Sequence, residues 1–210
     1  MITYVARRML QALVVMAAVS FISFSLFNYV GDPVDNMVGQ EATLEDRQRI
    51  REVLGLEDPF FVQYTRFMQN AVQGEFGLSY RTKRSVTAMI SERIPATLEL
   101  VFVSAVIALG VGIPLGVYTG INRTSWLSKA VLTVSLVGVS LPTFIIGIGL
   151  IYLFAVHLGV LPSSGRAGTV TLNGWKTSLL TLDGWRSILL PALTLSLFQV
   201  TMILRLVRAE

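Results

Sequence analysis

Two residues at the edges of the apolar parts of this sequence have side chains that could bind or move a proton. Glu99, in the stretch "PATLEL", lies at the start of a long apolar run, and His157, the single histidine, lies near the end of another. Carriers that are coupled to protons or sodium usually need carboxylates or histidines at mid-membrane. Because neither residue lies there, we predict a paired structural role for Glu99 and an interfacial position for His157.

The motifs of familiar catalytic sites are missing from the sequence. It contains no G-x-x-x-x-G-K-[ST] phosphate loop, no H-E-x-x-H motif and no Ser–His pair inside an apolar run. It also has no cysteine, which excludes disulfides and thiolate metal sites. We therefore predict no catalytic, cofactor-binding or metal-binding residues on this chain, so that any energy source must lie on a partner.

The apolar runs are long enough to cross a membrane. The chain is 53% hydrophobic and 14% charged, whereas soluble domains are about 25% charged. Four runs contain no Asp, Glu, Lys or Arg, and roughly 20 helical residues cross a bilayer core. We predict an all-α integral membrane protein whose first span is an uncleaved anchor, because it lacks the cleavage site of a signal peptide. The predicted spans are 9–30, 100–121, 131–157 and 187–204.

Basic residues gather in the short segments on one side of these spans. They are Arg7, Arg8, Arg123, Lys129, Arg205 and Arg208. Because Lys and Arg are retained on the cytoplasmic side, we predict a cytoplasmic N-terminus at 1–8 and an extracytoplasmic segment at 31–94. No basic patch is interleaved with exposed aromatic residues, so the expected partners include membrane lipids but no nucleic acid.

Small residues recur every four positions along the second span. Ala108, Gly112 and Gly116 form this stripe, with Ser104 before it and Gly120 after it. Helices in lipid approach closely where their side chains are small. We predict that the stripe is a helix contact within one subunit, with a contact between subunits as the alternative.

The third apolar run is too long for one straight crossing and contains Pro142. Proline removes a backbone donor and clashes with the preceding turn, so we predict a kink there. Pro191, by contrast, is expected near the first turn of its helix, where a missing N–H costs little. We hypothesise that Ser140, Pro142, Thr143 and Phe144 line a translocation path. The alternative is a kink that faces lipid or is merely packed.

Two short helices are expected in the segment 31–94. Thr43 and Asp46 have the spacing of a capping box, and Gly55 offers a stop for the helix that follows. A second amphipathic helix is predicted for "PFFVQYTRFMQNAV", and we favour a cover over the outer mouth for this pair rather than a binding groove.

A tandem repeat precedes the fourth span. "TLNGWKTSLL" (171–180) and "TLDGWRSILL" (181–190) share six of ten residues. Asn173-Gly174 and Asp183-Gly184 each predict a turn, and the two tryptophans, Trp175 and Trp185, suit a membrane surface. We assign no function to the first copy.

Several stretches together resemble the first permease subunit of dipeptide/oligopeptide ABC importers, a group that includes nickel and glutathione relatives. They occur in family order over nearly the whole chain. They are "YVARRML", "GDPV", "LGLEDPFFVQY", "GEFGLSYRTKRSV", "ERIPATLEL", "SLPTFIIGIGLIYLF", "LPSSGR" and "LLPALTLSL".

The resemblance implies a type I ABC importer transmembrane domain over 95–210, with four of the family's six helices present. It implies a second homologous permease, two ATPase subunits and an extracytoplasmic solute-binding protein as partners in a prokaryotic inner membrane. It also implies a chain that ends before the family's cytoplasmic coupling loop. The expected function is import of di- or oligopeptides or a related small solute. The alternatives are a secondary carrier or channel subunit and a truncated fragment that does not transport, with a membrane enzyme more distant.

Overall fold

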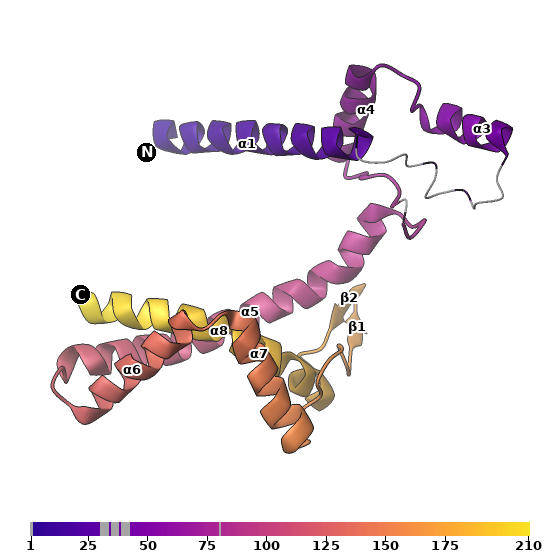
Figure 1. The fold of residues 1–210 in the computed structure, drawn as a ribbon. Coiled ribbons are helices and arrows are strands. Elements are labelled where there is room, and N and C mark those ends of the chain that lie inside the picture. Colours follow the sequence, from indigo (N-terminus) through magenta and orange to yellow (C-terminus); the bar gives the residue numbers. More distant parts are fainter. Residues whose placement is uncertain (1, 30–33, 35–37, 39–42, 80) are drawn as a thin grey trace. The chain divides into compact units, whose positions relative to one another are not determined.

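The computed structural model describes residues 2–29, 34, 38, 43–79 and 81–210. The chain divides into two compact units, Met1–Glu92 and Arg93–Glu210, each of which has its own internal contacts. Val30, the predicted end of the first span, and the first three residues of the "GDPV" motif lie outside the described residues. The described elements, labelled in Figure 1, are α1 (Ile2–Tyr29), α3 (Leu44–Leu54), α4 (Phe60–Val72), α5 (Val86–Ile121), α6 (Trp126–Ser140), α7 (Thr143–Ile151), the π-helix η1 (Tyr152–His157), β1 (Val170–Leu172), β2 (Trp175–Thr177) and α8 (Leu182–Ala209).

Three of the described helices are long and apolar enough to cross a membrane: α1 over Thr3–Leu26, α5 and α8. They overlap the first, second and fourth predicted spans. Helix α5 begins at Val86 and α8 at Leu182, well before the apolar runs at 100 and 187. Helical hydrogen bonds do not require apolar side chains, so a helix can extend beyond its apolar part into polar sequence.

The third predicted span, 131–157, is divided between several elements. Helix α6 ends at Ser140, two residues are non-helical, and α7 begins after Pro142. Pro142 has φ −56° and ψ 134°, which is extended backbone. The expected kink is therefore a full break, because proline also disfavours helical geometry in the residue before it. Neither half reaches the length of a full span.

Prolines inside the other long helices do not break them. Pro191 lies inside α8, not near its first turn as predicted, because α8 starts earlier than the apolar run. Helix α5 likewise contains Pro95 and Pro114 without interruption. Membrane helices accept such prolines where neighbouring groups satisfy the freed backbone.

The first unit is held together by an aromatic cluster between α1 and α4. Phe24 of α1 packs edge-to-face against Phe60 of α4 and at a tilt against Phe67, each with ring centroids 5.5 Å apart. The oxygens of Ser20 and Tyr64 lie 2.9 Å apart and share a hydrogen bond between the same two helices. The helical spacing of the aromatic residues in α4 thus gives one face that packs on α1.

Helix α3 has the termini that its sequence predicts. The Thr43 hydroxyl accepts from the Asp46 N–H at 3.2 Å, and the Asp46 carboxylate accepts from the Thr43 backbone. The hydroxyl of Thr43 also donates to this carboxylate, and these hydrogen bonds lower the pKa of Asp46. Gly55 ends the helix with φ 64°, the left-handed conformation that glycine adopts readily. The capping box and the glycine stop are confirmed.

The second unit is built around α8. Val103 of α5 packs against Ile188 and Ala192 of α8 to form a small buried core. On the other side, the Thr201 hydroxyl of α8 lies 3.5 Å from the Ser135 carbonyl of α6. In α7, Gly147 approaches Thr194 of α8 so closely that an added Cβ would lie 3.3 Å from its methyl group.

The tandem repeat forms two different structures. The first copy makes a hairpin, in which β1 and β2 pair antiparallel around Asn173 (φ 47°) and Gly174 (φ 82°), as predicted. In the second copy Asp183 and Gly184 lie in the first turn of α8, so the predicted turn there is wrong. Thr181 caps this helix by accepting from the Gly184 N–H at 3.1 Å.

Candidate translocation and packing sites

The predicted path residues lie on exposed surface at the break between α6 and α7. Ser140, Pro142, Thr143 and Phe144 are all exposed in the chain, Phe144 to 64%. The Ser140 hydroxyl donates to the Leu136 carbonyl at 2.9 Å, which leaves its oxygen free to accept. The break therefore combines extended backbone, hydroxyl groups and an aromatic ring on one uncovered surface. Irregular backbone at membrane depth is tolerated only within protein or beside a wet cavity.

The small-residue stripe of α5 lies directly against the backbone of α8. A Cβ at Gly112 would lie 3.0 Å from the Cβ of Ile203, and one at Gly116 would lie 2.7 Å from the Cβ of Val207 and 3.1 Å from the Leu204 carbonyl. Ala108 is buried on the same face of α5. The stripe thus lies in a contact within this chain.

The register of these contacts fixes the relative directions of the helices. Along α5, position 112 faces 200–203 of α8, position 116 faces 204–207 and position 120 faces 208. The residue numbers rise together, so the two helices run parallel. From α6 to α7, positions 135 and 147 face 201 and 194, so this pair of helices runs antiparallel to α8. The ends that carry Arg123 and Arg208 therefore lie on the same side of the second unit.

Glu99 is buried within α5, at the start of its apolar run and away from the end that precedes Arg123, with 5% of its surface exposed. Its carboxylate accepts from the Arg166 guanidinium at 2.9 Å and from the Ser178 backbone N–H at 3.1 and 3.2 Å. The paired role predicted for Glu99 is confirmed. His157 is exposed at the end of the π-helix.

Sequence reasoning missed the two partners of Glu99. No motif singles out Arg166 in the sequence, and Ser178 lies in the repeat copy to which no role was assigned. One signal distinguishes the copies: position 178 is serine in the first, whereas the matching position 188 is a buried isoleucine in the second. A serine at the position where the other copy has a buried isoleucine indicates that the serine hydroxyl has a polar partner inside the protein.

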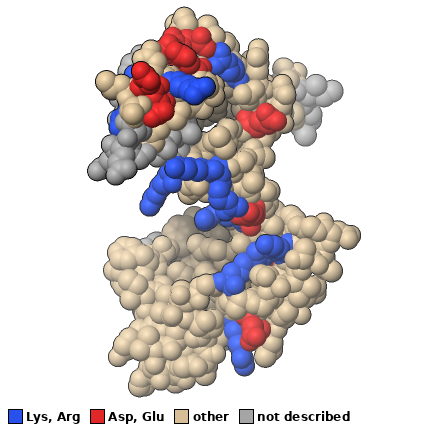
Figure 2. Space-filling view, turned by 90° about the vertical axis from the view of Figure 1, so that its right-hand side faces the viewer, with Lys and Arg blue, Asp and Glu red and all other residues tan. Residues whose placement is uncertain are grey.

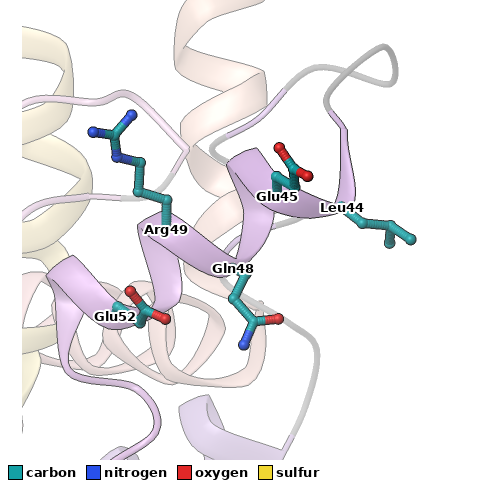
Figure 3. Close-up of a pocket in the computed structure, with 5 residues that line it drawn as sticks. All are labelled: Leu44, Glu45, Gln48, Arg49 and Glu52. Carbon is teal, nitrogen blue, oxygen red and sulfur yellow. The ribbon is translucent and has the colours of Figure 1, made fainter.

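Charge is distributed unequally over the surface. Figure 2 shows acidic and basic side chains crowded over the part of the first unit that contains α3, while the visible face of the second unit is mostly uncharged. Figure 3 shows a hollow lined by Leu44, Glu45, Gln48, Arg49 and Glu52, all of them from α3. One helix provides only one wall, so we assign no binding function to this hollow.

The chain has long apolar helices with exposed apolar faces, a break at a proline and a basic end. Together these features define a multi-pass membrane protein. Comparison with protein families gives a more specific answer. A model described as the N-terminal part of the binding-protein-dependent transport system membrane component matches residues 1–101, and the model of the inner membrane component itself matches 112–210. The chain belongs to this family of binding-protein-dependent transport system inner membrane components.

Curated relatives agree with this assignment. The chain is similar to a protein of Brucella abortus (strain 2308) named as a peptide transport system permease, with 35% identity over 212 residues, the whole of this chain and 65% of the relative. It is 32% identical over 211 residues to the glutathione transport system permease protein GsiC of Escherichia coli (strain K12), again over its whole length and 64% of the relative. A protein of the same strain named as the D,D-dipeptide transport system permease DdpB is 39% identical over 153 residues, 72% of this chain and 45% of the relative.

The chain thus spans just under two thirds of the length of the first relatives it matches. The predicted resemblance is confirmed, and so is the fold class: the chain is a mostly helical transmembrane domain of the type I ABC transporter class. The structure adds one short hairpin, β1–β2, to the all-α fold that was predicted.

Proposed function

We propose that this chain is a membrane-spanning permease subunit of an ATP-driven importer for di- or oligopeptides or a related small solute. The observation that carries the proposal is the ordered match of both family models across nearly the whole chain. The names of the relatives, which refer to peptides, D,D-dipeptides and glutathione, support the substrate class.

The path for the solute runs along the break between α6 and α7 and is completed by a second homologous permease. Ser140 and Thr143 offer hydroxyls to the amide groups of a passing peptide, and Phe144 provides an apolar surface. All four path residues are uncovered in the isolated chain, as a surface that faces a partner across a cavity must be.

Energy for transport comes from partner chains. The sequence has no phosphate loop and no mid-membrane carboxylate, so this subunit is not an enzyme and ATP hydrolysis takes place on two separate ATPase subunits. A solute-binding protein on the extracytoplasmic side delivers the substrate. No cofactor is needed on this chain.

The N-terminus lies in the cytoplasm and α3 and α4 lie outside. This orientation is supported by the parallel course of α5 and α8, whose C-terminal ends carry Arg123, Arg205 and Arg208 on one side. Positive charges of this kind are retained in the cytoplasm.

Cysteine labelling tests the orientation in a chain that has no cysteine of its own. With Glu45→Cys, an impermeant thiol reagent is expected to label intact cells, because α3 is exposed and lies outside. With Ser125→Cys, labelling is expected only after the cells are permeabilised. The reverse pattern, with position 125 labelled in intact cells and position 45 protected, would overturn the topology.

The function itself is tested by uptake of a labelled dipeptide in cells with and without this chain. Removal of the chain is expected to lower the initial rate to the background level. A secondary carrier differs in its energy source, which the same assay distinguishes when ATP and the proton gradient are removed separately.

A further inference from the structure

The Glu99 carboxylate joins α5 to two segments that are far away in the sequence. The Arg166 guanidinium donates to one carboxylate oxygen at 2.9 Å. The hydroxyl and the backbone N–H of Ser178 donate to the same carboxylate, the hydroxyl at 2.5 Å. The relative exposures of the Glu99 and Arg166 side chains are 5% and 25%, so the ion pair is largely shielded from water. We call Glu99, Arg166 and Ser178 the outer lock.

The outer lock also fixes the hairpin to the loop before it. Arg166 donates a second hydrogen bond, at 2.6 Å, to the carbonyl of Lys176 in β2. One guanidinium therefore holds both α5 and the hairpin. Ser178 follows β2 directly and lies near the C-terminal end of the first repeat copy. Its hydrogen bonds to Glu99 therefore attach that end of the copy to α5.

The second repeat copy is packed against the first. The backbone carbonyl of Ser178 occupies the place that a Cβ on Gly184 would need, so only glycine fits there. The Thr181 hydroxyl donates to the Gly168 carbonyl while it accepts from the Gly184 N–H. The start of α8 is thereby tied to the same loop that Glu99 holds.

We propose that Glu99 is a positioning residue and that the outer lock stays closed throughout the transport cycle. Opening the lock would separate a largely shielded ion pair together with the two hydrogen bonds from Ser178, and breaking a buried pair is strongly destabilising. Helices α5 and α8 then move as one body, held at one end by the outer lock and further along by Gly112 and Gly116. The motion that transport requires then takes place elsewhere in the chain. We place it at the break between α6 and α7, at Pro142. This inference rests on the proposed function in so far as it concerns a transport cycle.

The test replaces the lock with a removable covalent bridge. Glu99→Cys combined with Ser178→Cys removes the lock, and we expect dipeptide uptake to fall about tenfold, because the largely shielded Arg166 is left without its carboxylate partner. A short bifunctional methanethiosulfonate reagent should then join the two cysteines and restore uptake to within about twofold of the wild type. Reduction with dithiothreitol should remove the bridge and the recovered uptake together.

Two results would overturn the inference. If the bridged protein is inactive and recovers on reduction, the lock opens in each cycle. If no bridge forms, Glu99 and Ser178 are not neighbours in the membrane. General damage from the substitutions cannot explain a recovery that appears with the bridge and disappears with reductant.

Limited proteolysis provides a second readout that does not need transport. Trypsin cleaves after Lys176 only when the hairpin opens, so Glu99→Gln should speed this cleavage about tenfold in detergent. Asp183→Asn is the matched control, because it removes an exposed carboxylate near the hairpin. The matching position of the first repeat copy, 173, is already asparagine. This substitution should leave the rate of cleavage after Lys176 unchanged. Equal rates in the wild type and in Glu99→Gln would refute the positioning role.

Failure of the two proposals can be told apart. If the wild-type chain supports no uptake, the proposed function fails and proteolysis still decides the role of Glu99. If Glu99→Gln does not accumulate in membranes, Ser178→Ala gives a milder change, because it keeps the carboxylate, the guanidinium and the backbone N–H. It should still speed cleavage, and an unchanged rate would count against the lock.

Discussion

Leucine at position 116 is expected to separate α5 from α8 and to destabilise the second unit strongly. A Cβ alone would lie 2.7 Å from the Cβ of Val207, and the Leu204 backbone carbonyl, at 3.1 Å, has no rotamer by which to move away. Overpacking costs up to about 3 kcal/mol, and at roughly 2–4 °C per kcal/mol for a chain of this size the melting temperature in detergent should fall by about 6–12 °C. Thermal unfolding of the purified protein measures this.

The same helix provides the control. Gly110 has open space around its Cβ position, so Gly110→Leu adds the same side chain to α5 without meeting α8. Its melting temperature should stay close to that of the wild type. Gly112→Leu should behave like Gly116→Leu, because Ile203 and the Val200 carbonyl approach that position to within 3.0 and 3.2 Å. If all three variants melt alike, the stripe is not a helix contact.

Alanine at position 142 is expected to reduce uptake while leaving assembly intact. It restores a backbone N–H between α6 and α7 and removes a residue that disfavours helix by about 3 kcal/mol. The two helices can then join across Leu141, which closes the irregular backbone that we place on the path. We expect the maximal rate of dipeptide uptake to fall about tenfold, because substitutions at hinge positions change the rates of conformational steps.

Pro114→Ala is the matched control for this experiment. Pro114 lies inside α5, which is continuous on both sides of it, so its replacement should change neither assembly nor uptake. Equal uptake by Pro142→Ala and the wild type would remove the break from the proposed path. Loss of assembly in Pro142→Ala would instead indicate that the break serves packing.

The sequence predicted the features that depend on neighbours in the chain. Thr43, Asp46 and Gly55 define the ends of α3 through local hydrogen bonds, and Pro142 interrupts a helix through its own ring. Three of the four apolar runs likewise predicted where helices long enough to span a membrane lie. Each of these signals acts within a few residues, so no knowledge of the tertiary structure was needed.

The features that the sequence did not predict depend on distant contacts. The two repeat copies, which share six of ten residues, form a hairpin and a helix start. Ser178 of the first copy contacts Glu99, whereas Ile188 of the second enters the core beside Val103. Both copies carry the same Gly-Trp pair and similar flanking residues, so tertiary contacts contribute to the choice between the two structures. The partners of Glu99 were missed for the same reason, since Arg166 lies 67 residues away in the chain.

We propose that this chain is part of an importer that moves peptides through a membrane with energy from ATP. The most direct measurement is the initial rate of labelled dipeptide uptake in cells in which the chain is deleted and then restored. Each strain is assayed once with an ionophore that collapses the proton gradient while ATP is maintained, and once with ATP depleted while the gradient is maintained. We predict uptake that returns with the chain, persists without the gradient and stops without ATP. Uptake that is independent of the chain, or that follows the gradient and not ATP, would contradict it.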